Sequence, residues 1–199
     1  MRAVLRLTAL AAVSTLLLAG CTTTDQLALD YGSGGNKNYV AGDGTVLELA
    51  PDERTDPVTF EGVTDAGLTV SSKDYAGEVL VVNFWAGYCA PCRVEAPLLE
   101  KLSQKWSGDG VAFLGVNTYD EAETSLAFAR TYGVTYPSVI DARSGAVQLA
   151  FAGTVAPSAL PTTIVLDREG RVAARILGQI PAASILDAIV KTLVAESPQ

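Results

Sequence analysis

The sequence contains no histidine among its 199 residues, and only three cysteines, Cys21, Cys89 and Cys92. The lack of histidine excludes Ser–His and Cys–His catalysis and most zinc and copper sites, because imidazole takes part in all of them. The chain also lacks a basic run: Lys and Arg number 14 and Asp and Glu 22, a formal net charge of −8. This charge argues against nucleic acid as a partner.

The N-terminal region has no apolar run long enough to span a bilayer comfortably, since residues 7–18 rise only roughly 1.5 Å each in a helix. Arg2 and Arg6 precede this run, and Leu18-Ala19-Gly20-Cys21 ends it. A positive start, a short apolar stretch and small residues before a cleavage point indicate a signal peptide. The cysteine that follows resembles the lipobox of bacterial lipoproteins, whose thiol takes a diacylglyceryl group. An ordinary signal peptide followed by a chance cysteine is the alternative.

These features divide the chain into three parts. We expect residues 1–20 to be a lipoprotein signal peptide, residues 21–45 a flexible tether lipid-anchored at Cys21, and residues 46–199 one folded domain. The tether is predicted from its many Thr, Asp, Gly, Ser and Asn residues. Apolar residues make up 49% of the chain, enough for a core without disulfide staples. The expected location is the extracytoplasmic face of the cell membrane.

Apolar runs and turn residues predict a mixed sheet with helices on both faces. Strands are expected at residues 46–49, 58–60, 68–71, 79–85, 111–116, 137–140, 162–166 and 171–176. Helices are expected at 90–106, at 121–132 and from Pro181 onward, with a short helix or a turn at 146–151. In the first of these helices, the apolar stripe is expected to comprise Val94, Leu98, Leu102 and Trp106. This order of elements is typical of an α/β fold.

The pair Cys89-Ala-Pro-Cys92 lies between a predicted strand and a predicted helix. A helix N-terminus presents unpaired N–H groups and the positive end of the dipole, which stabilise a thiolate and lower the thiol pKa. We therefore expect Cys89, at the exposed edge, to attack a substrate disulfide and Cys92, facing inward, to resolve the mixed disulfide. Half of a zinc site and a structural disulfide are the alternatives, and neither accounts for the strand before and the helix after.

The segment Val82-Asn-Phe-Trp-Ala-Gly-Tyr-Cys-Ala-Pro-Cys-Arg-Val-Glu-Ala-Pro97 resembles the signature of the thioredoxin-like TlpA/ResA group. The resemblance extends over about residues 57–193. It implies a thioredoxin-like fold, with a central mixed β-sheet flanked by helices, an N-terminal β extension and a β-α insertion. Tyr136-Pro137 looks like the start of the strand that follows this insertion.

The resemblance also implies a substrate-docking surface. Its expected members are Trp85, Tyr88, Pro91, Leu160 and Pro161. Leu160-Pro161 looks like the loop that holds a cis-proline opposite the cysteines in thioredoxin-like proteins, where Leu160 would offer its backbone N–H and C=O to a peptide. An ordinary turn with a trans proline is the alternative.

Glu95 stands where ResA-like proteins have a carboxylate close beneath the cysteines, and Asn83 stands where thioredoxin has a buried aspartate. Because a nearby carboxylate disfavours a second negative charge, we expect Glu95 to raise the thiol pKa values and to accept the proton of Cys92. A solvated position on the helix surface is the alternative. The predicted catalytic set is Cys89, Cys92 and Glu95, without cofactor or metal.

These residues predict a thiol–disulfide oxidoreductase. The resemblance favours a reductant of exported proteins such as apocytochrome c, supplied with electrons by a membrane thiol carrier of the CcdA or DsbD type. A disulfide-forming oxidase for secreted proteins is the alternative. A copper-delivery lipoprotein would need a histidine, a peroxidase would need a Pro-x-x-x-Thr-x-x-Cys that is absent, and a plain binding lipoprotein would leave the cysteine pair without a role.

The lipobox resemblance generates a prediction about anchoring. Cys21→Ala should release the protein from membranes or block its processing, because the thiol that would carry the lipid is gone. Detergent partitioning of the wild type and the variant measures this. A wild-type protein that stays in the aqueous phase would show that Cys21 carries no lipid.

Overall fold

The computed structural model describes residues 45–152 and 159–196. The expected signal peptide, Cys21 and the expected tether up to residue 44 lie outside the described residues. Among the helices of the described part, none has the length and apolar character needed to cross a membrane.

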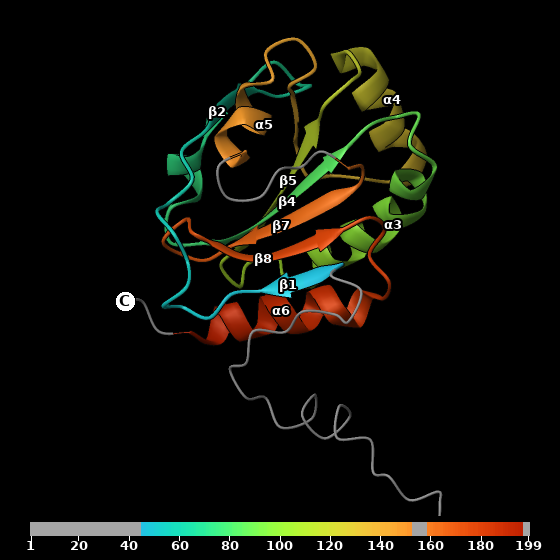
Figure 1. Ribbon diagram of the computed structural model, residues 1–199. Coiled ribbons are helices and arrows are strands. Elements are labelled where there is room, and N and C mark those ends of the chain that lie inside the picture. The colour runs from blue at the N-terminus through green and yellow to red at the C-terminus, as the bar shows by residue number, and fades with distance from the viewer. Residues whose placement is uncertain (1–44, 153–158, 197–199) are drawn as a thin grey trace, which may run out of the picture. The chain divides into compact units, whose positions relative to one another are not determined.

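The described chain forms a central mixed sheet, as expected (Figure 1). Its six strands lie in the order β1 (Val46–Glu48), β8 (Val172–Leu177), β7 (Thr162–Leu166), β4 (Val79–Trp85), β5 (Val111–Asn117) and β6 (Ser138–Ile140). The strands β4, β5 and β6 are mutually parallel, and the pairs β4–β7, β7–β8 and β1–β8 are antiparallel. A second sheet pairs β2 (Glu61–Val63) with β3 (Thr69–Ser71), and a 3₁₀ helix, η1 (Ser72–Tyr75), follows.

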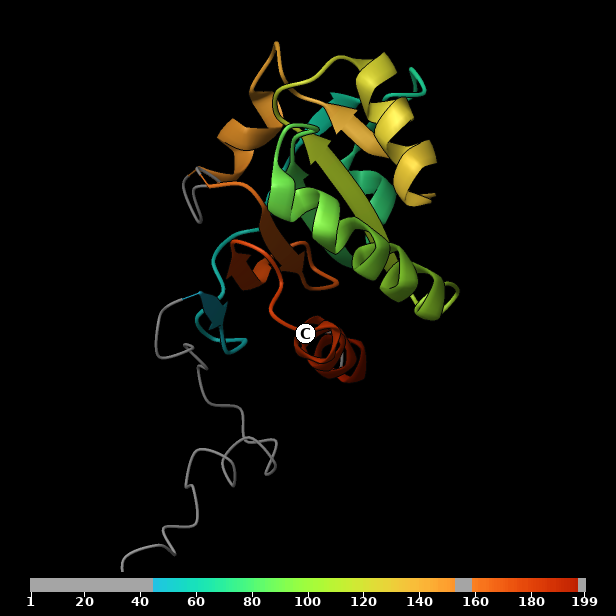
Figure 2. The same ribbon diagram turned by 90° about the vertical axis from the view of Figure 1, so that its right-hand side faces the viewer.

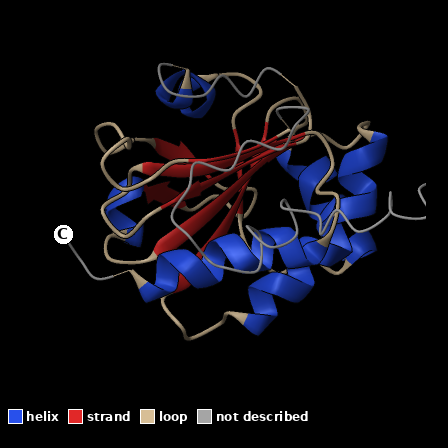
Figure 3. Cartoon of the chain, turned by 60° about the horizontal axis from the view of Figure 1, so that its bottom comes forward, coloured by secondary structure: helices blue, strands red, loops and turns tan. Residues whose placement is uncertain are grey.

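The strand β4 is buried along its whole length, and its alternating side chains build two cores. Val79 and Val81 face the core beneath α3 (Ala90–Lys105) and α6 (Ala183–Ala195). The alternate side chains Leu80, Val82 and Phe84 enter a second core with Phe151 of α5 (Ala146–Phe151). Figure 3 shows helices on both sides of the sheet. A further helix, α4 (Ala122–Tyr132), lies along β6 and beside α3 (Figure 2).

The expected strand at residues 58–60 is wrong, because the paired strand lies next to it, at β2. Val58 and Phe60 are buried while Thr59 is exposed, an alternation that resembles a strand. Their backbones, however, bond to a turn and to η1 instead of a strand: the N–H of Val58 donates to the C=O of Gly170, and the C=O of Phe60 accepts from the N–H of Ser72. The side chains of residues 58–60 therefore alternate between buried and exposed although their backbone does not pair with a strand among the described residues.

The stripe expected on the first long helix is confirmed in part, since Leu102 is buried and Leu98 and Trp106 pack, partly buried, against the core. The residues of α3 that are buried are Cys92, Glu95, Ala96, Leu99 and Leu102, whereas Val94 is 63% exposed. The buried face of α3 begins with Cys92, whose side chain points inward. The other buried residues follow at intervals of three and four, because residues with this spacing lie on one side of a helix. The last helix begins at Ala183, so Pro181 precedes it instead of opening its first turn.

Candidate active site

Three loops meet at one edge of the sheet. Trp85 at the end of β4 is in register with Asn117 at the end of parallel β5, and Phe84 is in register with Thr162 at the start of antiparallel β7. The loops after β4, after β5 and before β7 therefore lie side by side. They carry the cysteine pair, residues 118–121 and the Leu160-Pro161 turn.

The cysteine pair is joined as a disulfide at the start of α3. Cys89 is the N-cap, and its Sγ accepts a hydrogen bond of 3.2 Å from the backbone N–H of Cys92. Cys89 is 6% exposed and Cys92 2%, so Cys89 is the more accessible sulfur, though less exposed than an edge position suggests. The first turn of the helix thus points at the outer sulfur an N–H that has no carbonyl partner within the helix. There it stabilises a thiolate.

The Leu160–Pro161 peptide bond is cis, as the resemblance implies. Pro161 is buried, and the half-buried Leu160 packs against the cluster that contains both cysteines. The turn therefore lies against the cluster that contains the disulfide.

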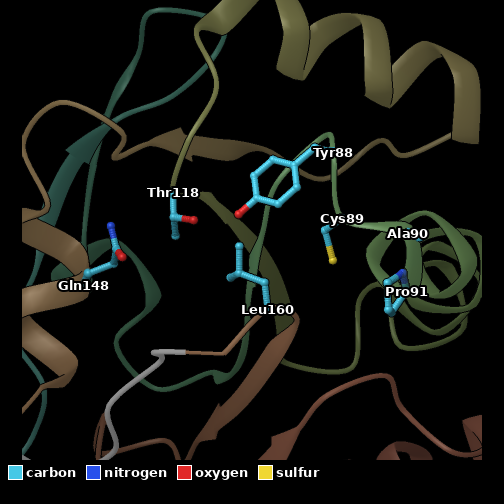
Figure 4. Close-up of a pocket in the computed structure, with 7 residues that line it drawn as sticks. All are labelled: Tyr88, Cys89, Ala90, Pro91, Thr118, Gln148 and Leu160. Atoms are coloured by element: carbon cyan, nitrogen blue, oxygen red, sulfur yellow. The ribbon is translucent and has the colours of Figure 1, made fainter.

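A groove of about 470 Å³ opens beside the outer cysteine (Figure 4). We call it the active-site groove; it is lined by Tyr88, Cys89, Ala90, Pro91, Thr118, Gln148 and Leu160. Tyr88, Pro91 and Leu160 were expected there from the sequence, whereas Thr118 and Gln148 were not. Thr118 could have been suspected, because it directly follows a buried strand parallel to β4. Gln148 could not, because its helix reaches the groove only through the tertiary fold.

Trp85 does not belong to the docking surface, which corrects that expectation. Its side chain is 5% exposed, stacks on Phe128 with ring centroids 4.2 Å apart, and donates from Nε1 to Ser138 Oγ at 3.3 Å. Gly115 leaves the space for this bond, because a Cβ there would collide with Ser138 Oγ and lie 2.9 Å from Nε1 of Trp85. Trp85 instead belongs to the buried cluster that contains both cysteines.

The loop before Cys89 is held in place by hydrogen bonds to both backbone groups of Gly87. The backbone N–H of Gly87 donates to the carboxylate of Asp120 at 2.6 Å, and its C=O accepts from the Arg93 guanidinium at 3.1 Å. The rings of Tyr88 and Tyr119 also meet edge to face, with centroids 5.0 Å apart. These contacts connect the loop after β5 to the loop that carries the outer cysteine.

Glu95 lies on the buried face of α3, one turn beyond Cys92, and is 1% exposed. Its carboxylate accepts from Asn83 Nδ2 at 2.9 Å and from the backbone N–H of Ile180 at 3.0 Å. Burial raises the pKa of Glu95 to about 7, although these two hydrogen bonds lower it in part. The alternative of a solvated helix residue is therefore wrong, and the carboxyl group can exchange a proton near neutral pH.

The inner sulfur faces a second, much smaller space of about 10 Å³. Its lining includes Cys92, Asn83, Tyr136 and Ser138. Burial raises the pKa of Tyr136, and the negative charge of Glu95 raises it further, so its phenol keeps its proton. The two cysteines thus face different surroundings, an open groove outside and a small cavity with a mostly apolar lining inside.

In the part of the chain that the structure describes, no group of three or more His, Cys, Asp or Glu residues is placed to hold a metal ion. The chemistry of the described residues at the cysteine pair is that of two sulfurs and the buried carboxyl group of Glu95.

The family model that matches this chain is Redoxin, over residues 48–190. Thiol-disulfide oxidoreductase ResA of Bacillus thuringiensis (strain Al Hakam) is 32% identical over 121 residues, which cover 59% of this chain and 65% of that protein. The chain therefore spans slightly less than two thirds of the length of that curated relative.

Two solved structures from Corynebacterium are similar over most of the chain. A DsbF homologue from Corynebacterium diphtheriae superposes with a TM-score of 0.67 at 31% identity, covering 80% of this chain and 100% of that one. A secreted thiol-disulfide isomerase from Corynebacterium glutamicum has a TM-score of 0.69 at 29% identity, covering 82% and 100%. The expected thioredoxin-like fold is confirmed.

The buried carboxyl group generates a prediction about stability. The folded protein binds the Glu95 proton more tightly than the unfolded chain, whose pKa is near 4.5. The stabilisation from this group is therefore complete below about pH 4.5 and is lost as the pH rises through about 7, a difference of about 3 kcal/mol. Glu95→Gln should abolish this slope. Denaturant unfolding of the oxidised protein, in which neither cysteine titrates, measures the free energy at each pH.

The matched control is Glu123→Gln, the same substitution at an exposed position of α4. It should leave the slope between about pH 4.5 and about pH 7 intact. If Glu95→Gln retains the slope of the wild type, the carboxyl group does not titrate with a raised pKa in the folded protein.

Proposed function

Because this chain belongs to the Redoxin family, we propose that it is a protein thiol–disulfide oxidoreductase that reacts through Cys89 and Cys92. The observation that carries the proposal is the unequal placement of the two sulfurs at the start of α3. Cys89 faces an open groove that Leu160 of the cis Leu160–Pro161 turn also lines, and Cys92 is buried on the same face of α3 as the carboxyl group of Glu95, one turn away.

The proposed reaction starts from the reduced pair. The Cys89 thiolate attacks one sulfur of a substrate disulfide, so that a Cys89–substrate bond forms, the substrate S–S bond breaks, and the departing thiolate takes a proton. Cys92 then passes its proton to Glu95, and its thiolate attacks the sulfur of Cys89. This step releases the second substrate thiol and leaves the Cys89–Cys92 disulfide found in the structure. Two electrons move from the protein to the substrate.

We propose that electrons flow in this reducing direction, on the extracytoplasmic face of a membrane to which Cys21 anchors the chain. The proposed substrates are disulfides of exported proteins, foremost the haem-binding C-x-x-C-H of apocytochrome c. A membrane thiol carrier of the CcdA or DsbD type would restore the dithiol. The supports are the lipobox resemblance, the relative named ResA, and Glu95, which opposes the effect of the helix on the thiolate.

A second candidate is the formation or rearrangement of disulfides in secreted proteins. It is favoured by the similarity to a DsbF homologue and to a secreted thiol-disulfide isomerase. It is also favoured by the hydrogen bond from the N–H of Cys92 to Cys89 Sγ, because a stabilised thiolate makes the disulfide form a better oxidant. The reduction potential separates the two candidates.

We predict a potential nearer to the roughly −270 mV of thioredoxin than to the roughly −120 mV of a strong oxidant. The buried Glu95 penalises a thiolate on the cysteine pair and so favours the disulfide. Glu95→Gln should make the couple more oxidising and lower the Cys89 pKa. Equilibration with glutathione gives the potential, and thiolate absorbance gives the pKa. A wild-type potential near −120 mV would reject the reductant and support the second candidate.

The two cysteines should also differ in reactivity when each is present without the other. Cys92→Ala should accumulate mixed disulfides through Cys89, because the attack can occur but resolution cannot, whereas Cys89→Ala should trap few. Non-reducing electrophoresis of each variant with oxidised substrate protein measures the yields. Preferential trapping by Cys89→Ala would assign the nucleophile to the inner sulfur instead.

A further inference from the structure

The active-site groove extends well beyond the cysteines. Figure 4 shows Cys89 and Pro91 at the start of α3 on one side and Gln148 of α5 on the other, with Leu160 and Thr118 between them. At about 470 Å³ the groove is larger than a disulfide needs, since pockets of this size hold whole small ligands. None of its seven lining residues is charged. It therefore has room for substrate residues next to the reacting cysteine.

The side chain of Gln148 is held in one orientation at the far end of this groove. Its Nε2 donates to Asp141 Oδ2 at 3.1 Å, and a carboxylate can only accept, so the positions of the amide nitrogen and oxygen are fixed. Asp141 is itself 1% exposed and held by the backbone N–H groups of Val147 and Gln148, at 3.1 and 2.9 Å. Among the described residues, no donor is bonded to Gln148 Oε1. The groove thus ends in an oriented acceptor.

We propose that the active-site groove binds an uncharged segment of the substrate next to its reacting cysteine, and that Gln148 selects this segment by accepting a hydrogen bond from it. This proposal rests on the proposed function and names its substrate class. A charged side chain in the groove would lose water without gaining a partner of opposite charge among the lining residues, which is unfavourable. A segment without a donor would leave the Gln148 oxygen unpaired, whereas a side-chain amide or hydroxyl group would satisfy it.

The test uses peptides with one disulfide that differ at a single position, about two to four residues from the reacting cysteine, where Asn, Leu or Asp is placed. The reduced full-length protein is mixed with each peptide in a single turnover, and the rate of thiol loss is measured. Every rate is divided by that of the same protein with bis(2-hydroxyethyl) disulfide, so that general changes in cysteine reactivity cancel. The variants are Gln148→Met, which keeps the length without the acceptor, and Leu149→Ala at the neighbouring, 75% exposed position.

At one of these positions the wild-type protein should react with the Asn peptide about tenfold faster than with the Leu peptide, and slowest with the Asp peptide. Gln148→Met should lose this tenfold advantage of Asn over Leu, and Leu149→Ala should keep it. Equal wild-type rates for Asn and Leu at every position, or an advantage that survives in Gln148→Met, would overturn the role of Gln148 while leaving the proposed function intact. A wild type that reduces none of the peptides or the small disulfide would overturn the proposed function itself.

Discussion

The pairing of β4 with β5 on one side and β7 on the other is the constraint on which the active site depends. A run buried on both faces fits only the centre of the sheet. Of its two neighbours, β5 runs parallel to β4 and β7 runs antiparallel to it. This arrangement brings the carboxyl ends of β4 and β5 to the same edge as the start of β7. The cysteines, the loop after β5 and the cis-proline turn then meet although they are far apart in the sequence.

The same central strand explains how the carboxyl group of Glu95 stays buried one turn beyond Cys92 although no cation among the described residues pairs with it. Asn83 projects from β4 toward α3, where its amide donates both to Glu95 and to Thr163 of β7, and Ile180 approaches from the segment before α6. Three elements thus supply or orient the partners of one acid. Burial of Glu95 lowers the free energy of unfolding when the carboxyl group is ionised. The protein is therefore less stable at the pH at which this group can accept a proton.

The sequence predicts the frame of the molecule well because its strongest signals are local. The apolar runs at residues 79–85 and 111–116, the cysteine spacing and the glycine at the end of α4 each act over a few residues. What it misses depends on contacts between distant segments. Trp85 is expected on the docking surface from the family resemblance, but its indole packs on Phe128 and donates a hydrogen bond to Ser138. Gln148 was missed because only the packing of α5 brings it to the groove.

Gly115 makes three positions of the sheet interdependent in evolution. A larger residue there would collide with the hydroxyl group of Ser138 and press on the indole of Trp85. Such a residue can be accepted only after the hydroxyl group of Ser138 has been lost or has turned away, because effects of substitutions at touching positions are not additive. Substitutions in the floor of the site must therefore accumulate in a particular order, although position 115 contributes no side-chain atom of its own.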